Sequence, residues 1–349
     1  MWAKRVMAAL LTAPWLLLGL VPTAQAAPDP NLTVTNVTLS GTSVAVSGLN
    51  LVPLTATVTG GYTSSEPGDV DMTLYVVLER TGGTGPLRYM FSTDLKRISG
   101  TTQNGVWQGP LNVPSTANGT FKVTGVYAIP FGYVPPGPLD PTPFAGPTVT
   151  VAGYHLPKIT ASVTPKAVPF GSPYSIRWAV IDSATGKPYG TRIPVLLGVD
   201  NECAEYVGGV VARTDTNGLV TRSYQAGWAD ALNCLRLSGK PFDISGLGLF
   251  VARPGIVSAV PSKTSAPVGT IVPVNGSVLG PPTGCLVVLQ RLYGATQWRG
   301  VSSGSVRQSG RFTVTAQPAY RGLIPYRVYF PTCSRYQAGL SKVFYIRGT

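Results

Sequence analysis

The chain has 349 residues, which is enough for two or three ordinary domains. Glycine and proline are abundant, with 41 and 32 residues, while 12% of the residues are charged and 44% are hydrophobic. This composition excludes a disordered polyelectrolyte, because the apolar residues suffice to build packed cores. One histidine and four cysteines leave little room for histidine-based catalysis or for metal centres.

The N-terminus has the pattern of a secretory signal peptide. A basic start and an apolar run at 6–21 precede the small-residue triplet 24–26 (AQA), which is typical of a cleavage site. The run is short for a membrane span, which needs about twenty residues, and Pro14 interrupts it. We therefore predict that residues 1–26 are cleaved and that the mature chain is secreted into the extracellular space without a transmembrane segment.

Export makes disulfides the expected state of the four cysteines, because thiols outside the cytosol persist in oxidised form. Three pairings are possible, and pairing in sequence order would keep each bridge inside one predicted domain. A zinc site is excluded by the absence of a CxxC pair and of a nearby histidine. We expect two structural disulfides, no metal and no cofactor; the cysteines are Cys203, Cys234, Cys285 and Cys333.

Short segments with period-2 alternation, rich in Val, Thr, Tyr and Ile, recur throughout the mature chain. The clearest lie at 33–39, 54–58, 121–127, 159–163, 312–315 and 342–346. Turn clusters such as 183–188 and 215–218 separate these segments, and no long stretch shows helical periodicity. Short strands with a turn about every ten residues predict an all-β protein made of sandwiches or barrels.

An internal repeat indicates the domain boundaries. The segment 159–166 (ITASVTPK) recurs at 256–263 (IVSAVPSK), an offset of about 97 residues that matches the size of one sandwich. A weaker echo relates 74–80 (LYVVLER) to 286–291 (LVVLQR).

Linker-like segments lie at 153–157 and 252–255. They divide the mature chain into predicted domains at 27–153, 154–254 and 255–349.

Two groups of motifs resemble bacterial immunoglobulin-like domains. The segments 182–188 (DSATGKP) and 214–218 (TDTNG) look like such a domain. The segment 288–291 (VLQR), with Trp298 and 309–313 (SGRFT), resembles the tandem modules of secreted actinobacterial proteins. The resemblance covers the second and third predicted domains well and the first poorly. It implies three tandem immunoglobulin-like β-sandwiches, a fold that by itself implies no function.

Candidate catalytic and metal-binding residues are few. His155 is the sole histidine and lies in a predicted linker, so no Ser–His–acid or Cys–His arrangement forms without it. Asp200, Glu202 and Glu205 leave open a calcium site. The turn 215–218 (DTNG) lacks the remainder of a calcium loop and is interpreted as a hairpin turn held by its own side chains. We expect the protein not to be an enzyme.

A proline-rich segment interrupts the first predicted domain. Residues 130–147 contain seven prolines in eighteen positions, together with Phe131, Tyr133 and Phe144. Proline stiffens such a segment and favours extended geometry. The segment is either a rigid cover over an open core edge or an aromatic binding loop.

Charge is distributed unevenly among the predicted domains. Residues 27–153 contain five basic and seven acidic side chains, and residues 154–254 contain ten and seven. Residues 255–349 contain ten basic side chains, eight of them arginine, and no acidic side chain. A domain of this composition cannot neutralise itself by internal ion pairs, so its potential is strongly positive.

Strand alternation suggests how the arginines of 255–349 are presented. Arg327 and Tyr329 share one face of a predicted strand, as do Tyr345 and Arg347 of the last one. If these strands are neighbours, arginine and tyrosine interleave on one outer face. Arg291, at the end of the row Val287, Leu289 and Arg291, is added to this face. Such a surface suits an anionic polymer, because charge and ring contacts act together.

These observations favour a secreted, non-enzymatic binding or adhesion protein. Its basic C-terminal domain is predicted to dock on an anionic cell-wall or extracellular polymer. The alternative is an adaptor in an extracellular protein assembly, which would bind a protein partner through the proline-rich segment or an exposed strand edge. A third interpretation gives the arginines no ligand and assigns their charge to solubility.

Overall fold

The computed structural model describes residues 28–63, 72–130, 141–204, 209–239 and 243–349. The predicted signal peptide, Phe131, Tyr133 and Glu205 lie outside the described residues. Within those ranges the chain is almost entirely β-structure, and no helix there has the length and apolar character needed to cross a membrane.

The first sandwich packs a four-stranded sheet on a larger one. The first sheet contains, in spatial order, β1 (Leu32–Leu39), β3 (Leu51–Tyr62), β7 (Gly105–Pro114) and β6 (Lys96–Gly100). The second contains β2 (Ser43–Ser47), β10 (Thr148–Tyr154), β8 (Gly119–Pro130), β4 (Met72–Gly82) and β5 (Tyr89–Phe91), with β9 (Thr142–Pro143) on β8. A single 3-10 turn, η1 (Ser115–Ala117), precedes β8.

The second sandwich is built from two smaller sheets. One contains β11 (Pro157–Thr164), β12 (Tyr174–Asp182) and β15 (Leu219–Tyr224), and the other β14 (Val210–Arg213), β13 (Pro194–Val199), β16 (Asn233–Leu237) and β17 (Ser245–Leu249). A helical turn, α1 (Asn201–Ala204), follows β13, and a 3-10 turn, η2 (Ala226–Asp230), follows β15.

The third sandwich repeats the plan of the first. Its smaller sheet contains β18 (Val257–Pro261), β20 (Val272–Val278) and β23 (Arg311–Ala316). Its larger sheet contains β19 (Ser265–Ala266), β26 (Phe344–Gly348), β24 (Gly322–Phe330), β21 (Leu286–Tyr293) and β22 (Gln297–Ser305), with β25 (Gly339–Leu340) on β24.

The strand order confirms the prediction of immunoglobulin-like sandwiches. In the first sandwich, β1-β3-β7-β6 corresponds to strands A-B-E-D of that fold, and β10-β8-β4 to G-F-C. The repeated segments identified in the sequence occupy equivalent positions: β11 and β18 are first strands, while β4 and β21 are C strands. We propose that each sandwich is one domain, divided at the linker-like segments.

Two details differ from the sequence predictions. The last strand begins at Phe344, two residues later than the alternation suggested. The turn at 215–218 is not a hairpin turn, because it joins β14 and β15, which belong to different sheets. Its side-chain support is present, since the Asp215 carboxylate accepts a hydrogen bond of 2.8 Å from the Leu219 amide.

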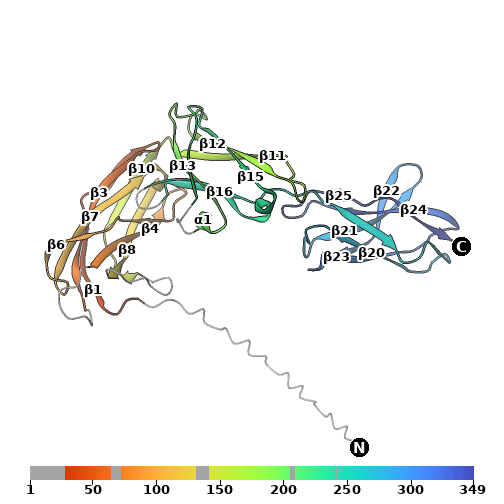
Figure 1. The fold of residues 1–349 in the computed structure, drawn as a ribbon. Coiled ribbons are helices and arrows are strands. Elements are labelled where there is room, and N and C mark those ends of the chain that lie inside the picture. Colours follow the sequence, from red (N-terminus) through yellow and green to blue (C-terminus); the bar gives the residue numbers. More distant parts are fainter. Residues whose placement is uncertain (1–27, 64–71, 131–140, 205–208, 240–242) are drawn as a thin grey trace, which may run out of the picture.

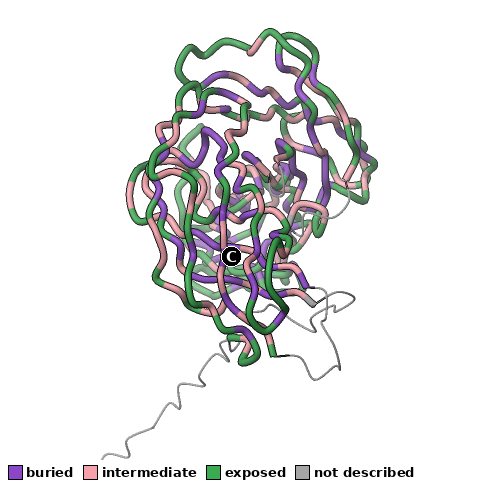
Figure 2. The backbone as a smooth tube through the Cα atoms, turned by 90° about the vertical axis from the view of Figure 1, so that its left-hand side faces the viewer, coloured by how far each residue is buried: buried purple, intermediate pink, exposed green. Residues whose placement is uncertain are grey.

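Each sandwich encloses its own apolar core, and Figure 2 shows buried and exposed stretches alternating along the chain. This follows from the period-2 pattern, which sends successive side chains to opposite faces of a strand. Large fully buried side chains include Trp107 in the first core, Trp178 in the second and Phe312 in the third. Phe144, from the proline-rich segment, packs partly buried against the first core, so this aromatic ring covers the sandwich.

Two disulfides bridge the second and third sandwiches, in the sequence-order pairing. Cys203 in α1 joins Cys234 in β16, with a Cα–Cα distance of 5.8 Å. Cys285, just before β21, joins Cys333, just after β24, at 6.0 Å. Both bridges tie neighbouring parts of one sandwich together.

The first and second sandwiches contact each other directly (Figure 1). Leu49 and Leu51 from the first pack against the core of the second. The Thr116 hydroxyl donates a hydrogen bond of 2.5 Å to the carbonyl of Ile244.

Arg253, in the linker-like segment 252–255, contacts both the second and the third sandwich. Its backbone N–H donates a 2.9 Å hydrogen bond to the Arg335 carbonyl, and its carbonyl accepts one of 2.8 Å from the Gln337 amide, while its side chain lies in the second sandwich. Arg253 is 2% exposed, and its guanidinium forms a fork on the Asp230 carboxylate, with N–O distances of 3.2 and 2.8 Å. The Arg253 guanidinium also stacks on Phe170, which packs against the core of the third sandwich. The Asp230 carboxylate also forms an ion pair with Arg335 of the third sandwich, with an N–O distance of 2.8 Å.

Candidate functional site

The β21–β22 hairpin of the third sandwich gathers arginines and aromatic rings on both of its faces. A bulge interrupts its register: Leu289 pairs with Ser302, but the next residue, Gln290, pairs with Gly300. The extra residue on β22 exchanges the faces of all residues beyond it. As a result Arg299 lies opposite Arg291, while Trp298 points to the other side.

One face of the hairpin carries two arginines on a shared ring. The guanidinium carbons of Arg291 and Arg299 lie 4.5 and 4.9 Å from the centre of the Tyr293 ring. Arg291 donates a hydrogen bond to the Tyr293 hydroxyl, and Arg299 donates two to the side-chain oxygen of Gln297. Two positive charges are therefore held close together by neutral groups.

The other face carries a third stack. The Arg327 guanidinium carbon lies 4.2 Å from the centre of a Trp298 ring, and Arg327 Nε donates a 2.8 Å hydrogen bond to the Gln290 side-chain oxygen. We call the group Arg291, Tyr293, Trp298, Arg299 and Arg327 the arginine–aromatic cluster. Its charges have no acidic partner within residues 255–349, which contain no Asp or Glu.

Tyr326 closes the core beneath the cluster. Burial raises the pKa of its phenol above the ordinary value, although nearby Arg291 opposes this shift. The hydroxyl donates a 3.0 Å hydrogen bond to the carbonyl of Gln317. The Tyr326 phenol is therefore neutral, so it packs beneath the hairpin without neutralising the charge of the arginines.

The structure places four of the predicted binding residues on one outer face. Strands β24 and β26 are neighbours, and their register sets Pro325 opposite Tyr345 and Leu323 opposite Arg347. Arg327 and Tyr329 lie on the same outer side of β24, since the residues between and around them are buried.

Arg291 does not belong to this face, so its predicted placement is wrong. It pairs with the buried Tyr326 and continues the row of Val287 and Leu289, both of which are fully buried. The row faces the core, and Arg291 extends beyond its end onto the opposite side of the hairpin.

The remaining arginines of the third sandwich point in several directions. Arg307 and Arg311 lie at the smaller sheet, on the other side of the sandwich. Arg335 is held at the joint by Asp230, the one carboxylate that the described ion pairs bring to a basic residue of 255–349. Positive charge is thus distributed around the sandwich and is not confined to one face.

The acidic residues considered for calcium hold the backbone. Asp200 accepts a 2.8 Å hydrogen bond from the amide of Leu232, and Glu202 accepts one of 2.9 Å from Val199. Glu205 lies outside the described residues. Within the described part of the chain, no group of three His, Cys, Asp or Glu residues is arranged to hold a metal ion.

His155 has a structural contact at the joint of the first two sandwiches. Its Nδ1 lies 2.7 Å from a carboxylate oxygen of Asp182. Burial would raise the pKa of Asp182, but hydrogen bonds from the Ala184 amide, His155 and the Thr185 hydroxyl outweigh burial and lower it. The pair stabilises the turn after β12.

Comparisons with known proteins give no family. No protein-family model and no curated protein matches the chain. Among solved structures, the chain is similar to the adhesin InvE of Yersinia pseudotuberculosis, with 12% identity over 55% of this chain and a TM-score of 0.28. It spans 58% of the length of that InvE chain.

Two further solved structures are similar in the same limited sense. FdeC, an Escherichia coli adhesin, is 15% identical over 93% of this chain and 99% of its own, with a TM-score of 0.29. The D0-D1 domain of intimin is 12% identical over 54% of this chain and 97% of its own, with a TM-score of 0.20. Since these scores lie below 0.5, the fold assignment rests on the strand order, and no function is transferred.

Proposed function

We propose that the protein is a secreted, non-enzymatic binding or adhesion protein that attaches to an anionic surface polymer through its third sandwich. The observation that carries this proposal is the arginine–aromatic cluster. Three guanidinium groups stack on two rings, donate hydrogen bonds to neutral side-chain oxygens, and lie in a segment without acidic side chains.

The chemistry of the cluster fits such a ligand. A guanidinium presents parallel N–H donors that match a phosphate or a carboxylate. Stacking on a ring orients each fork and offers an apolar surface beside it. Because Arg307 and Arg311 lie at the smaller sheet, on the other side of the sandwich, a flexible polymer or a polymer network can contact more of these charges than a flat surface can.

The remainder of the chain fits an extracellular role. Two disulfides cross-link the second and third sandwiches, and such bonds persist in oxidising compartments. In this arrangement the third sandwich is the attachment module, and the first two extend away from the polymer (Figure 1).

The test uses the mature chain, residues 27–349, and a biosensor surface coated with long-chain polyphosphate. We expect the triple variant Arg291→Gln, Arg299→Gln, Arg327→Gln to bind about 50-fold more weakly, because three charge-assisted contacts are lost. The matched control removes the same charge from the second sandwich, where the three exposed arginines are Arg177, Arg192 and Arg213.

The two triple variants separate a local site from a general effect of net charge. The proposal requires the control to retain binding within about threefold of the wild type. An equal loss in both variants, or no binding of polyphosphate by the folded wild-type chain, overturns it. Thermal melting of each variant verifies that the third sandwich is intact.

A further inference from the structure

The outer face of the smaller sheet of the third sandwich contains an open groove. Two adjoining hollows, of about 480 and about 570 Å³, lie along β18, β20 and β23. They meet at Ser258, Ser277 and Arg311, which line both. The groove therefore continues across all three strands, on the sheet opposite Arg327 and Tyr329.

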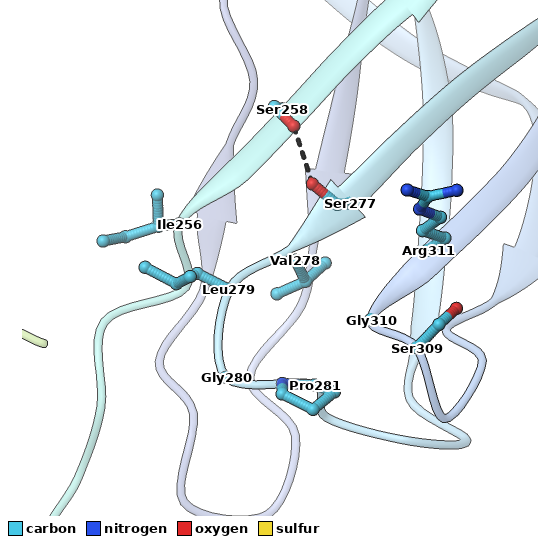
Figure 3. A pocket seen from close by; sticks show the side chains of 10 residues that line it. All are labelled: Ile256, Ser258, Ser277, Val278, Leu279, Gly280, Pro281, Ser309, Gly310 and Arg311. Atoms are coloured by element: carbon cyan, nitrogen blue, oxygen red, sulfur yellow. Dashed lines mark hydrogen bonds between the residues drawn. The ribbon is translucent and has the colours of Figure 1, made fainter.

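The register explains why this face is polar. Ser258 pairs with Ser277, which pairs in turn with Arg311 on the third strand. Figure 3 shows the two serine hydroxyls pointing toward each other, at an Oγ–Oγ distance of 2.9 Å, and Arg311 rising from the strand beside them. One cation thus stands next to a pair of hydroxyls.

A second polar row continues the groove. Asn275 pairs with Thr313, and the Thr313 hydroxyl donates a 3.0 Å hydrogen bond to the Asn275 side-chain oxygen. The same hydroxyl accepts a 2.7 Å hydrogen bond from Arg307. Two arginines therefore border a floor of neutral hydroxyl and amide groups, at whose edge the exposed Val260 pairs with Asn275.

The other end of the groove is apolar. Ile256 and Leu279 lie beside each other across from Arg311 in Figure 3, and these two residues are 47% and 48% exposed. Pro281 completes this wall. Exposed aliphatic groups here give the groove a surface for C–H groups of a ligand.

We propose that this groove is a second binding site, separate from the arginine–aromatic cluster, and that its ligand is an acidic saccharide whose sugar units carry carboxylates. The two arginines supply paired donors for carboxylates, and residues 255–349 contain no acidic side chain to occupy them. The serine, asparagine and threonine side chains match sugar hydroxyls, and the aliphatic wall matches the C–H faces of the rings. Each hollow has the size of a small-molecule site.

The neutral lining distinguishes this ligand from a simple polyphosphate. A phosphate chain offers charge and acceptor oxygens but few hydroxyl donors, so it adds few hydrogen bonds to the side-chain oxygens of Ser258, Ser277 and Asn275, which otherwise bond to one another or to Thr313. A sugar acid satisfies both kinds of group at once. The site therefore goes beyond the proposed function, because it selects by hydroxyl pattern as well as by charge.

The test measures binding of tetragalacturonate to the mature chain by titration calorimetry. The fully methyl-esterified tetramer, which keeps the hydroxyls and loses the charge, is the ligand control. We expect Arg311→Gln to weaken tetragalacturonate binding about tenfold and Thr313→Val about threefold. Arg321→Gln, in an exposed loop, removes the same charge and is expected to change affinity less than twofold.

The outcomes separate this site from the arginine–aromatic cluster. The triple variant of Arg291, Arg299 and Arg327 is expected to retain tetragalacturonate binding while losing polyphosphate. The proposal is overturned if the methyl ester binds as well as the acid, if Arg311→Gln binds like the wild type, or if the triple variant alone loses the sugar. A wild-type chain that binds polyphosphate but not tetragalacturonate also overturns it, and leaves the proposed function standing.

Discussion

Replacing Arg253 with methionine tests how far the buried fork on Asp230 stabilises the joint between the second and third sandwiches, where Asp230 also pairs with Arg335. Methionine keeps the apolar stem but deletes the guanidinium. The loss comprises two hydrogen bonds to Asp230, contacts of 3.3 Å to the carbonyls of Val168 and Pro169, and the stack on Phe170.

The magnitude follows from burial on each side of the pair. Removing one partner of a buried ion pair costs about 3–5 kcal/mol. Asp230 is 58% exposed and keeps Arg335, so water and that arginine recover part of the loss. We therefore expect about 3 kcal/mol for Arg253→Met, which lowers the midpoint of the shared transition by about 6–12 °C for a unit of two sandwiches.

Differential scanning calorimetry of residues 27–349 measures this shift. The matched variant Arg335→Met removes a guanidinium that is 25% exposed and contacts the same carboxylate. It is expected to cost about 1 kcal/mol or less. If Arg253→Met lowers the free energy of unfolding no more than Arg335→Met does, the fork does not stabilise the contact between the sandwiches, and the argument from burial is wrong.

Three further predictions concern the disulfide, the acid response and the ring of the cluster. Replacing both Cys285 and Cys333 with alanine is expected to cost about 4 kcal/mol, since their separation of 48 residues sets the loop entropy; guanidinium titration of oxidised and mutant chains measures it. The pKa of Asp230 is lowered in the folded chain, where burial is outweighed by Arg253 and Arg335. Its contribution to stability is therefore full above the unfolded pKa of about 4 and is lost as pH falls through the lower folded pKa; the stability gap between wild type and Asp230→Asn should close in that window, and a constant gap contradicts the assignment. Trp298→Leu is expected to weaken polyphosphate binding about fivefold through loss of the stack on Arg327, whereas an unchanged affinity on the biosensor removes the ring from the site.

The strands could be predicted because apolar and polar residues alternate in the sequence with the same two-residue period as buried and exposed side chains in a strand. The repeat at 159–166 and 256–263 fell on equivalent first strands, since each must turn an apolar row toward its own core. The neighbouring positions of β24 and β26 followed from the immunoglobulin-like order implied by the resemblance.

The partners of the arginines were not predictable in the same way. Arg291 was assigned to the outer face, although its row with Val287 and Leu289 was a buried one; the apolar character of that row was the signal that could have corrected it. Trp298 was missed as a stacking partner because a single bulge residue decides its face. Alternation within one strand carries no information about a bulge in its neighbour.

The contacts between the second and third sandwiches could not be predicted from the sequence, for a different reason. The segment 252–255 had the composition of a linker, yet Arg253 within it is buried. Its partners lie on η2, at Asp230, and before β12, at Phe170. Contacts between residues so far apart in the sequence depend on how two sandwiches meet, which no local pattern encodes.

The parallel pairing of early and late strands has a mechanical consequence. In the first sandwich β2 runs parallel to β10 over five residue pairs, and in the third β19 runs parallel to β26 over two. Tension applied to the two ends of the chain pulls such strands past each other, so their hydrogen bonds bear the load together and do not open one by one. Among the described strands of the second sandwich all pairings are antiparallel. We therefore expect the first sandwich to be the last to yield when the chain is stretched.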